Sequence, residues 1–172
     1  GYAEAVGENG LVFVTSRHTV VATEAYSVRL RSRKRSLVPL YSYVVATDPI
    51  PPHVWDEIGW DGRETLSDGR NMVTYAQRTG DGRIVFGGRG APYRFGSDIH
   101  SDSDTSERVH AKIVETLHEL FPQTKDIRIS HKWGGPLGVP RDWHPAVNTD
   151  PGTGAIHIGG YVGDGVALSY LA

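Results

Sequence analysis

Histidines, aromatic side chains and short glycine clusters are the features of this sequence that could take part in chemistry. The 172 residues include 8 His, 8 Tyr, 4 Trp and 21 Gly, and they include no Cys. Thiolate metal sites, disulfides and a cysteine nucleophile are therefore excluded. The histidines are poorly spaced for a metal, because His110 and His118 lie eight residues apart in one expected helix rather than four. We predict no metal site.

Serine chemistry has no motif to support it. A nucleophile elbow needs the pattern G-x-S-x-G, and Gly96-Ser97 is followed by Asp98 instead. A hydrolase is therefore only the third-ranked function, after an oxidoreductase and a binding module.

The glycines gather where the main chain must turn tightly or approach another group closely. The cluster Gly87–Gly90 follows an expected strand with no helix after it, which favours a strand-ending turn over a phosphate site. The segment from Gly160 to Gly165 lies between an expected strand and a helix-like run. Main-chain N–H groups at such a helix start stabilise a ligand that becomes anionic, although any tight strand-to-helix turn also uses glycine.

Short strands and one long helix must position these residues. We expect strands at residues 11–14, 19–23, 37–47, 72–78, 83–86, 127–131 and 154–158. Residues 19–23 do not alternate and are expected to be buried on both faces, whereas Tyr41 and Tyr43 share one face. Residues 72–86 predict a hairpin that turns at Gly80-Asp81-Gly82.

The long helix shows one apolar face, formed by Val109, Ile113, Leu117 and Leu120. Ser103 or Asp104 is expected to cap its start, and Pro122 stops it. A short helical turn is expected at 53–58, and a Gly/Pro-rich stretch follows His131. The fold class predicted is α+β, with a mostly antiparallel sheet and one long helix.

Charge and hydropathy limit the partners. Eighteen basic and 20 acidic side chains give a net charge of −2, which predicts no binding to nucleic acid or to an anionic membrane. The longest apolar runs span only a few residues, so we expect no transmembrane helix. The basic run Arg29–Arg35 could bind phosphate, but a solvated loop is favoured. The start shows no signal peptide, and a cytoplasmic location is expected.

Several segments, in order along the chain, together resemble FAD-dependent enzymes of the D-amino acid oxidase-like family, which includes glycine oxidase, sarcosine oxidase and γ-glutamylputrescine oxidase. The segment Val20–Tyr26 resembles the strand that closes their FAD domain. Residues 75–88 resemble their substrate-domain hairpin, and His131–Gly135 and His144-Pro145 follow in the family's order. Residues 159–169 resemble the C-terminal segment that contacts the flavin.

The resemblance implies a non-covalently bound FAD and a small amine or amino acid as substrate. A hydride would pass from a C–H bond beside the amine nitrogen to the flavin, and the resulting imine would be hydrolysed. Expected substrate-side or catalytic residues are Tyr75, His131 and Trp133. Expected FAD-binding residues are Ala22, Thr23, Gly160, Tyr161, Val162, Gly163, Asp164, Gly165 and Val166.

The sequence departs from the family pattern at three places. An Arg that clamps a substrate carboxylate in the amino-acid oxidases is replaced here by Pro136, which favours an amine. No Cys is present to link a flavin covalently. Some relatives carry a Lys where Ala167 stands, so that charge contact is missing.

The resemblance also predicts a division of the chain. Residues 1–35 are expected to be strands of an FAD domain, 36–150 a substrate-binding domain, and 151–172 a final FAD-domain strand and helix. The chain begins at Gly1, its one Met is Met72, and the helix-like run from Val166 to Ala172 stops after about two turns, so we expect a fragment. The G-x-G-x-x-G that binds the FAD pyrophosphate in such enzymes does not occur here, so we expect the chain to be inactive alone. The alternative is a stand-alone small-molecule binding module with a pocket lined by Tyr41, Tyr75 and Trp133.

Overall fold

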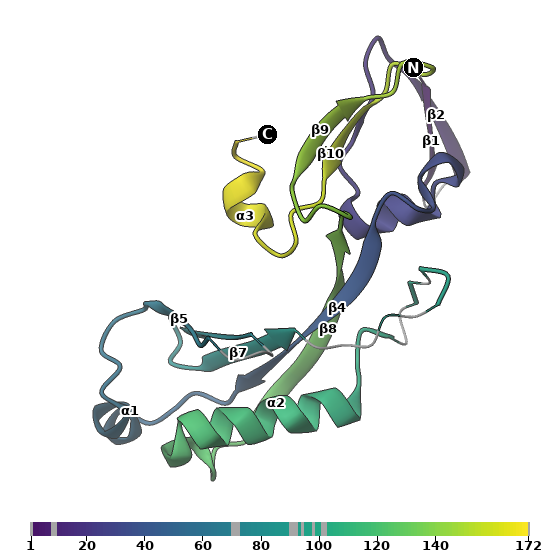
Figure 1. Cartoon of the computed structure of the whole chain (residues 1–172). Helices are drawn as coiled ribbons and strands as arrows, with labels where there is room; N and C mark the ends of the chain where they lie inside the picture. Colours follow the sequence, from purple (N-terminus) through teal and green to yellow (C-terminus); the bar gives the residue numbers. More distant parts are fainter. Residues whose placement is uncertain are drawn as a thin grey trace. The chain divides into compact units, whose positions relative to one another are not determined.

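The computed structural model describes residues 2–7, 10–69, 73–89, 93, 95–97, 99–100 and 103–171. The chain forms two compact units. Gly1–Pro39 and Leu137–Ala172 form one, here called the terminal unit, and Leu40–Pro136 forms the other, here called the central unit. The architecture is α+β with mostly antiparallel strand pairs, as predicted (Figure 1).

A five-stranded sheet organises the central unit. Its strand order is β5-β6-β7-β4-β8, with bounds Thr65–Ser67, Thr74–Arg78, Ile84–Arg89, Val38–Thr47 and Ile129–Val139. The predicted hairpin is confirmed as β6 and β7, which pair antiparallel, although Met72 lies outside the described residues. Its turn is closed by the Thr79 N–H, which donates to the Arg83 carbonyl over 2.9 Å, and Gly82 takes φ +78° there.

The long helix α2, Glu107–Leu120, packs on one side of this sheet (Figure 1). Ile113 and Leu117 are buried against Phe86 and its neighbours and Val109 packs beside them, so the predicted apolar face is confirmed there. Leu120, which was predicted to belong to it, is 38% exposed. The predicted cap is wrong, because Ser106 precedes the helix and makes no side-chain cap bond. The Ser103 carbonyl instead accepts a hydrogen bond from the Tyr43 hydroxyl over 2.7 Å, which holds that segment against the core ahead of the helix.

The short helix α1, Pro52–Ile58, matches the predicted turn and ends at Gly59, which has φ +70°. Trp55 and Trp60, at either side of that end, are buried with their rings 5.9 Å apart. Trp60 stacks on Phe121 at the end of α2, with ring centroids 5.7 Å apart. Aromatic contacts thus tie α1 to the end of the long helix.

The structure corrects the irregular stretch expected after His131, because β8 continues to Val139. The sequence Gly134-Gly135-Pro136 is unusual in a strand, but β8 is an edge strand, where the N–H that proline lacks is not needed. Glycine is required at position 134 because β8 passes very close to β4 there. A Cβ there would lie 2.5 Å from the Tyr43 ring and 3.0 Å from the Ser42 carbonyl.

The terminal unit contains a hairpin and a small mixed sheet. Strands β1, Tyr2–Gly7, and β2, Gly10–Thr15, pair antiparallel, and the expected turn residue Asn9 lies outside the described residues. The second sheet has the order β3-β10-β9, with bounds Val20–Val21, Ile156–Gly159 and Ala146–Thr149. Two 3-10 helices, Glu24–Arg29 and Arg31–Arg33, follow β3, and α3 spans Gly165–Leu168. In the central unit, the 3-10 helix Pro122–Thr124 follows α2.

Strand β3 also differs from its prediction. Val20 is 57% exposed, so burial on both faces is wrong. The strand is at the sheet edge and pairs with β10 alone, which leaves one flank uncovered. Strand β9 was not predicted, because all four of its residues are exposed and show no apolar pattern. In the part of the chain that the structure describes, no helix is both long and apolar enough to cross a membrane.

We expect Gly134→Ala to destabilise the chain by about 1–3 kcal/mol, since the added methyl overpacks a fixed ring. Tyr43 cannot move aside, because it is 4% exposed and its hydroxyl is bonded. Gly135→Ala is the matched control, as a Cβ there meets nothing within 4 Å. Urea unfolding measures both variants, and equal midpoints would contradict the close approach.

Candidate functional site

The turn between β10 and α3 has an unusual main chain. Gly160, Val162 and Gly163 all lie in the left-handed region, with φ of +80°, +55° and +103°. For Val162 this conformation is a genuine outlier, because its β-branched side chain crowds the main chain. Burial of that side chain, which is 8% exposed, helps to hold it there. Such strain persists where surrounding contacts enforce it, and it is common at ligand sites.

The contact that enforces the turn comes from Glu24. Its carboxylate accepts the Gly160 N–H over 2.8 Å and the Tyr161 N–H over 3.2 Å. Glu24 itself has φ +44°, and it is half-buried shortly after β3. A carboxylate that accepts two main-chain N–H groups makes charge-assisted hydrogen bonds, which are stronger than neutral ones.

Two further glycines make room for this carboxylate. A Cβ at Gly159 would lie 2.7 Å from Glu24 Oε2, and one at Gly138 would lie 3.0 Å from Oε1. Glu24 therefore occupies a notch whose walls are glycine main chain. This carboxylate joins the two segments that were expected to contact a flavin, the one containing Ala22 and Thr23 and the turn itself.

The sequence pattern did not single out Glu24 as a site residue, although it lies within the segment that carries the resemblance. The available signal was a lone carboxylate shortly after an apolar strand, four residues beyond Val20. Nearby, Thr23 Oγ1 and Ser27 Oγ lie 2.9 Å apart, and Ala22 is exposed.

The second half of the turn faces solvent. Gly163 and Asp164 are exposed, and Val166 is 96% exposed. The Asp164 N–H is already used, because it donates to the Tyr161 carbonyl over 2.9 Å. Within the described residues, the N–H groups of Gly163, Gly165 and Val166 donate to no protein acceptor. Helix α3 has only four residues, so its dipole is small. A negatively charged ligand at the turn would therefore be stabilised by hydrogen bonds from these N–H groups.

The three expected substrate-side residues lie on one face of the central sheet, the face opposite α2, here called the far face. Lys132 Nζ binds Glu107 of α2 over 3.0 Å, so its neighbours His131 and Trp133 point to the far face. Tyr43 packs edge-on against His110 of α2, so Ser42 also points to the far face.

Tyr75 reaches the same face from β6. Its hydroxyl lies 3.0 Å from Ser42 Oγ on β4, and its ring crosses Gly87 on the strand between them. A Cβ at Gly87 would overlap the Tyr75 ring and hydroxyl oxygen, so only glycine lets the ring lie flat there. The second glycine of the 87–90 cluster, Gly88, lies within β7, which continues to Arg89, so that cluster does not begin a turn at Gly87 as expected.

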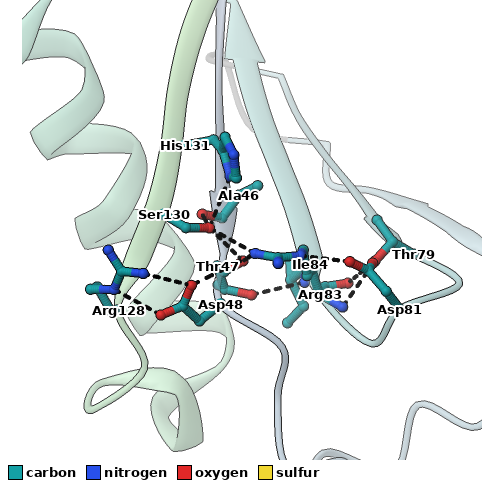
Figure 2. A network of polar contacts seen from close by, with 10 residues as sticks. All are labelled: Ala46, Thr47, Asp48, Thr79, Asp81, Arg83, Ile84, Arg128, Ser130 and His131. Atoms are coloured by element: carbon teal, nitrogen blue, oxygen red, sulfur yellow. Dashed lines mark hydrogen bonds and ion pairs between the residues drawn. The ribbon is translucent and has the colours of Figure 1, made fainter.

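His131 lies at the end of a polar network that joins β4, β7 and β8 (Figure 2). Ser130 Oγ lies 3.0 Å from the Thr47 carbonyl and 2.9 Å from Arg83 Nη1. The carbonyl can only accept, so the serine hydroxyl donates to it. His131 Nδ1, 3.0 Å from the same Oγ, must then supply its own hydrogen. This leaves Nε2 as the acceptor nitrogen of an exposed ring.

Ion pairs brace the same network. Asp48 pairs with Arg128 over 2.8 Å, and Arg83 pairs with Asp81 over 2.7 Å (Figure 2). Hydrogen bonds from Thr79 and Arg83 lower the pKa of the Asp81 carboxyl. Arg83 thereby links the hairpin turn to the strand that carries His131.

Trp133 is held by a residue that the sequence did not single out for this role. Its carbonyl lies 3.1 Å from Nε2 of His110, which is fully buried on α2. His110 Nδ1 lies 3.4 Å from the Ser106 N–H, so Nδ1 accepts and Nε2–H donates to Trp133. The Trp133 side chain is 42% exposed and free to meet a ligand.

Comparison with known proteins gives this geometry its context. The family described as FAD dependent oxidoreductase matches residues 2–172, which is nearly the whole chain. The chain belongs to the FAD dependent oxidoreductase family.

Two curated members of this family illustrate the relationship. The chain is 31% identical to "Probable oxidoreductase OrdL" of Rhizobium meliloti, over 91% of this chain and 34% of that protein. It is 28% identical to "Gamma-glutamylputrescine oxidoreductase" of Escherichia coli, over 92% of this chain and 35% of that protein. The chain thus spans about a third of the length of these relatives.

Solved flavoenzymes share the fold. Glycine oxidase from Geobacillus kaustophilus superposes with a TM-score of 0.72 at 19% identity, over 98% of this chain and 42% of that one. Iminodiacetate oxidase from Chelativorans sp. BNC1 gives 0.71 at 12% identity, over 100% of this chain and 46% of that one.

FAD is the cofactor of this oxidoreductase family. The turn has features that suit contact with a flavin ring. Its outer N–H groups are unused within the described residues, and its strained main chain is braced from behind by Glu24. Hydrogen-bond donors of this kind suit a ring edge that carries carbonyl oxygens and gains negative charge on reduction. Among the described residues no group of three or more His, Asp or Glu side chains is placed to hold a metal ion.

We expect Glu24→Ala to destabilise the chain by about 1.5–3 kcal/mol, because two N–H groups lose a charged acceptor. Amide hydrogen exchange at Gly160 and Tyr161 should accelerate. Glu115→Ala, an exposed helix position with the same change in charge, is the control. Unchanged exchange at both amides would show that Glu24 does not hold the turn.

We expect the His131 ring to carry its proton on Nδ1 when neutral, since Ser130 accepts from it. Long-range ¹H–¹⁵N correlation spectra assign the protonated nitrogen. Ser130→Ala should return the ring to a mixture of tautomers, whereas Ser36→Ala in the terminal unit should leave it unchanged. A neutral ring protonated on Nε2 in the unmodified chain would refute the network assignment.

Proposed function

We propose that this chain is part of an enzyme that oxidises the carbon next to an amine nitrogen and produces an imine. The family match supports the redox cofactor, and the braced turn with its unused N–H groups carries the proposal structurally. Bound FAD would accept the hydride from that C–H bond, and water would then hydrolyse the imine. The remaining steps concern this chain's own residues.

The terminal unit would hold the cofactor. The N–H groups of Gly163, Gly165 and Val166 would donate hydrogen bonds to its ring and stabilise the charge gained on reduction. Glu24 would keep the turn in position, with Ala22 and Thr23 beside it. Tyr161 and Asp164 would shape the turn through the bond between their main-chain groups.

The far face of the central unit would hold the substrate. Nε2 of His131 would take a proton from the substrate ammonium, because only a neutral amine can release a hydride from the adjacent carbon. The Tyr75 hydroxyl would orient the nitrogen, and the exposed Trp133 ring would provide an apolar wall. His110 and Ser130 would act as positioning residues behind Trp133 and His131.

The substrate is proposed to be an amine, or an amino acid whose carboxylate is held elsewhere. Pro136 follows Gly135 where the resemblance leads one to expect an arginine clamp. The name of the Escherichia coli relative, a gamma-glutamylputrescine oxidoreductase, also supports an amine. The expected cytoplasmic location stays a prediction.

The complete reading frame that contains this chain provides the test. We expect the purified product to be yellow and to oxidise members of an amine panel, read as peroxide release or dye reduction. Tyr75→Phe should lower kcat/KM by about tenfold, the loss of one hydrogen bond in the transition state. Tyr93→Phe, which removes the hydroxyl of a tyrosine that is 46% exposed, is the control.

Two results would overturn the proposal. A colourless product would show that the protein binds no flavin, and it would favour the stand-alone binding module. If the product is yellow but Tyr75→Phe and Tyr93→Phe lower kcat/KM equally, the far face is not the substrate site.

A further inference from the structure

An open pocket of about 100 Å³ lies within the terminal unit, and Gly160, the first residue of the turn, is the point at which its lining meets the residues of the proposed oxidation. Its polar lining comes from the 3-10 region, the residues before β9, and strands β9 and β10: Ser27, Arg33, Ser36, His144, Asn148 and His157. No carboxylate side chain is among the described lining residues. The described lining therefore combines polar hydrogen-bonding side chains and the Arg33 guanidinium without a carboxylate side chain.

Arg33 stands apart from the rest of the basic run. Arg29, Arg31, Lys34 and Arg35 are exposed, as expected of a solvated loop, whereas Arg33 is half-buried and lines the pocket. Within the described residues, no carboxylate pairs with the Arg33 guanidinium. A guanidinium withdrawn from water is costly unless an anion or hydrogen-bond acceptors meet it. The position favours an anionic ligand.

His157 and Asn148 face Arg33 from the sheet. They form a directly opposed pair on β10 and β9, so their side chains lie side by side on one face. Burial lowers the pKa of His157, and the nearby charge of Arg33 lowers it further, while Asp150 acts in the opposite direction. Arg33 and His157 thus line the same pocket, near enough for the charge of one to act on the other.

His144 adds a fourth polar group at the rim. Its Nδ1 lies 2.5 Å from the Asp142 main-chain carbonyl, which can only accept, so Nδ1 carries a hydrogen and Nε2 is left for other partners. In the neutral ring this Nε2 accepts a hydrogen bond, so it suits the hydroxyl of a protonated phosphate oxygen at the rim, while donors approach the pocket from the 3-10 region and from the sheet.

We propose that this pocket binds a phosphate group, held by Arg33 together with His157 and Asn148. A guanidinium fork matches two phosphate oxygens at once, and imidazole and amide donors from other directions suit a tetrahedral anion better than a planar carboxylate. The ligand is either inorganic phosphate or a phosphate monoester whose organic part extends out of the open pocket into solvent. The proposal does not depend on flavin binding or on amine oxidation.

An NMR titration of the 172-residue chain at low salt and near neutral pH tests the proposal, with inorganic phosphate, glycerol phosphate and acetate as separate probes. We expect saturable shifts at His157 with phosphate and none with acetate. Binding by inorganic phosphate but not by the ester identifies the free ion, and tighter binding of the ester identifies a monoester. Arg33→Gln should weaken binding by about tenfold or more, since a charged hydrogen-bond donor is lost.

Arg35→Gln removes the same charge from an exposed position, and it should change the affinity by less than about twofold. Asn148→Ala is a second variant in the pocket, and it should also weaken binding. Saturation with phosphate should raise the pKa of His157, because the anion offsets the charge of Arg33 while Asp150 is unchanged. Equal weakening by Arg33→Gln and Arg35→Gln, equal binding of acetate, or no shift at His157 would overturn the proposal.

Discussion

A single carboxylate, that of Glu24, bonds two segments that lie 136 residues apart in the sequence. It accepts the main-chain N–H groups of Gly160 and Tyr161, and glycine at 138 and 159 leaves the space that it fills. Because these two N–H groups point inward to Glu24, the turn is fixed with its later residues facing outward. Val162 and Gly163, the next two residues, both have left-handed conformations. The proposal that the turn contacts a flavin rests on this arrangement.

The central unit uses glycine in a comparable way. Gly87 lets the Tyr75 ring cross a strand to reach Ser42, and Gly134 lets β8 approach the buried Tyr43 ring. The face opposite α2 thereby presents a tyrosine, a histidine and a tryptophan, each supported by a partner behind it. Reactive side chains on strands are more precisely held than those on loops, and this face has that property.

Much of the fold could be predicted from local pattern, because a repeating apolar face or a turn sequence acts over a few residues. The helix around Ile113 and the hairpin at Gly82 are of this kind. The strand through Pro136 could not be predicted, since its stability depends on an edge position and on space beside Tyr43. The family resemblance singled out in sequence the turn and the residues that we propose to face the substrate. Glu24, His110 and Ser130 were missed because each acts through a partner distant in sequence or hidden by folding.

The most direct test of the account measures the turn itself in the complete protein. Amide exchange at Gly163, Gly165 and Val166 should be compared with FAD bound and with FAD removed. The account predicts that bound FAD protects these three amides, which have no protein acceptor among the described residues, and leaves the Glu24-bonded amides of Gly160 and Tyr161 protected in both states. Flavin binding that leaves exchange at all three unchanged would contradict it.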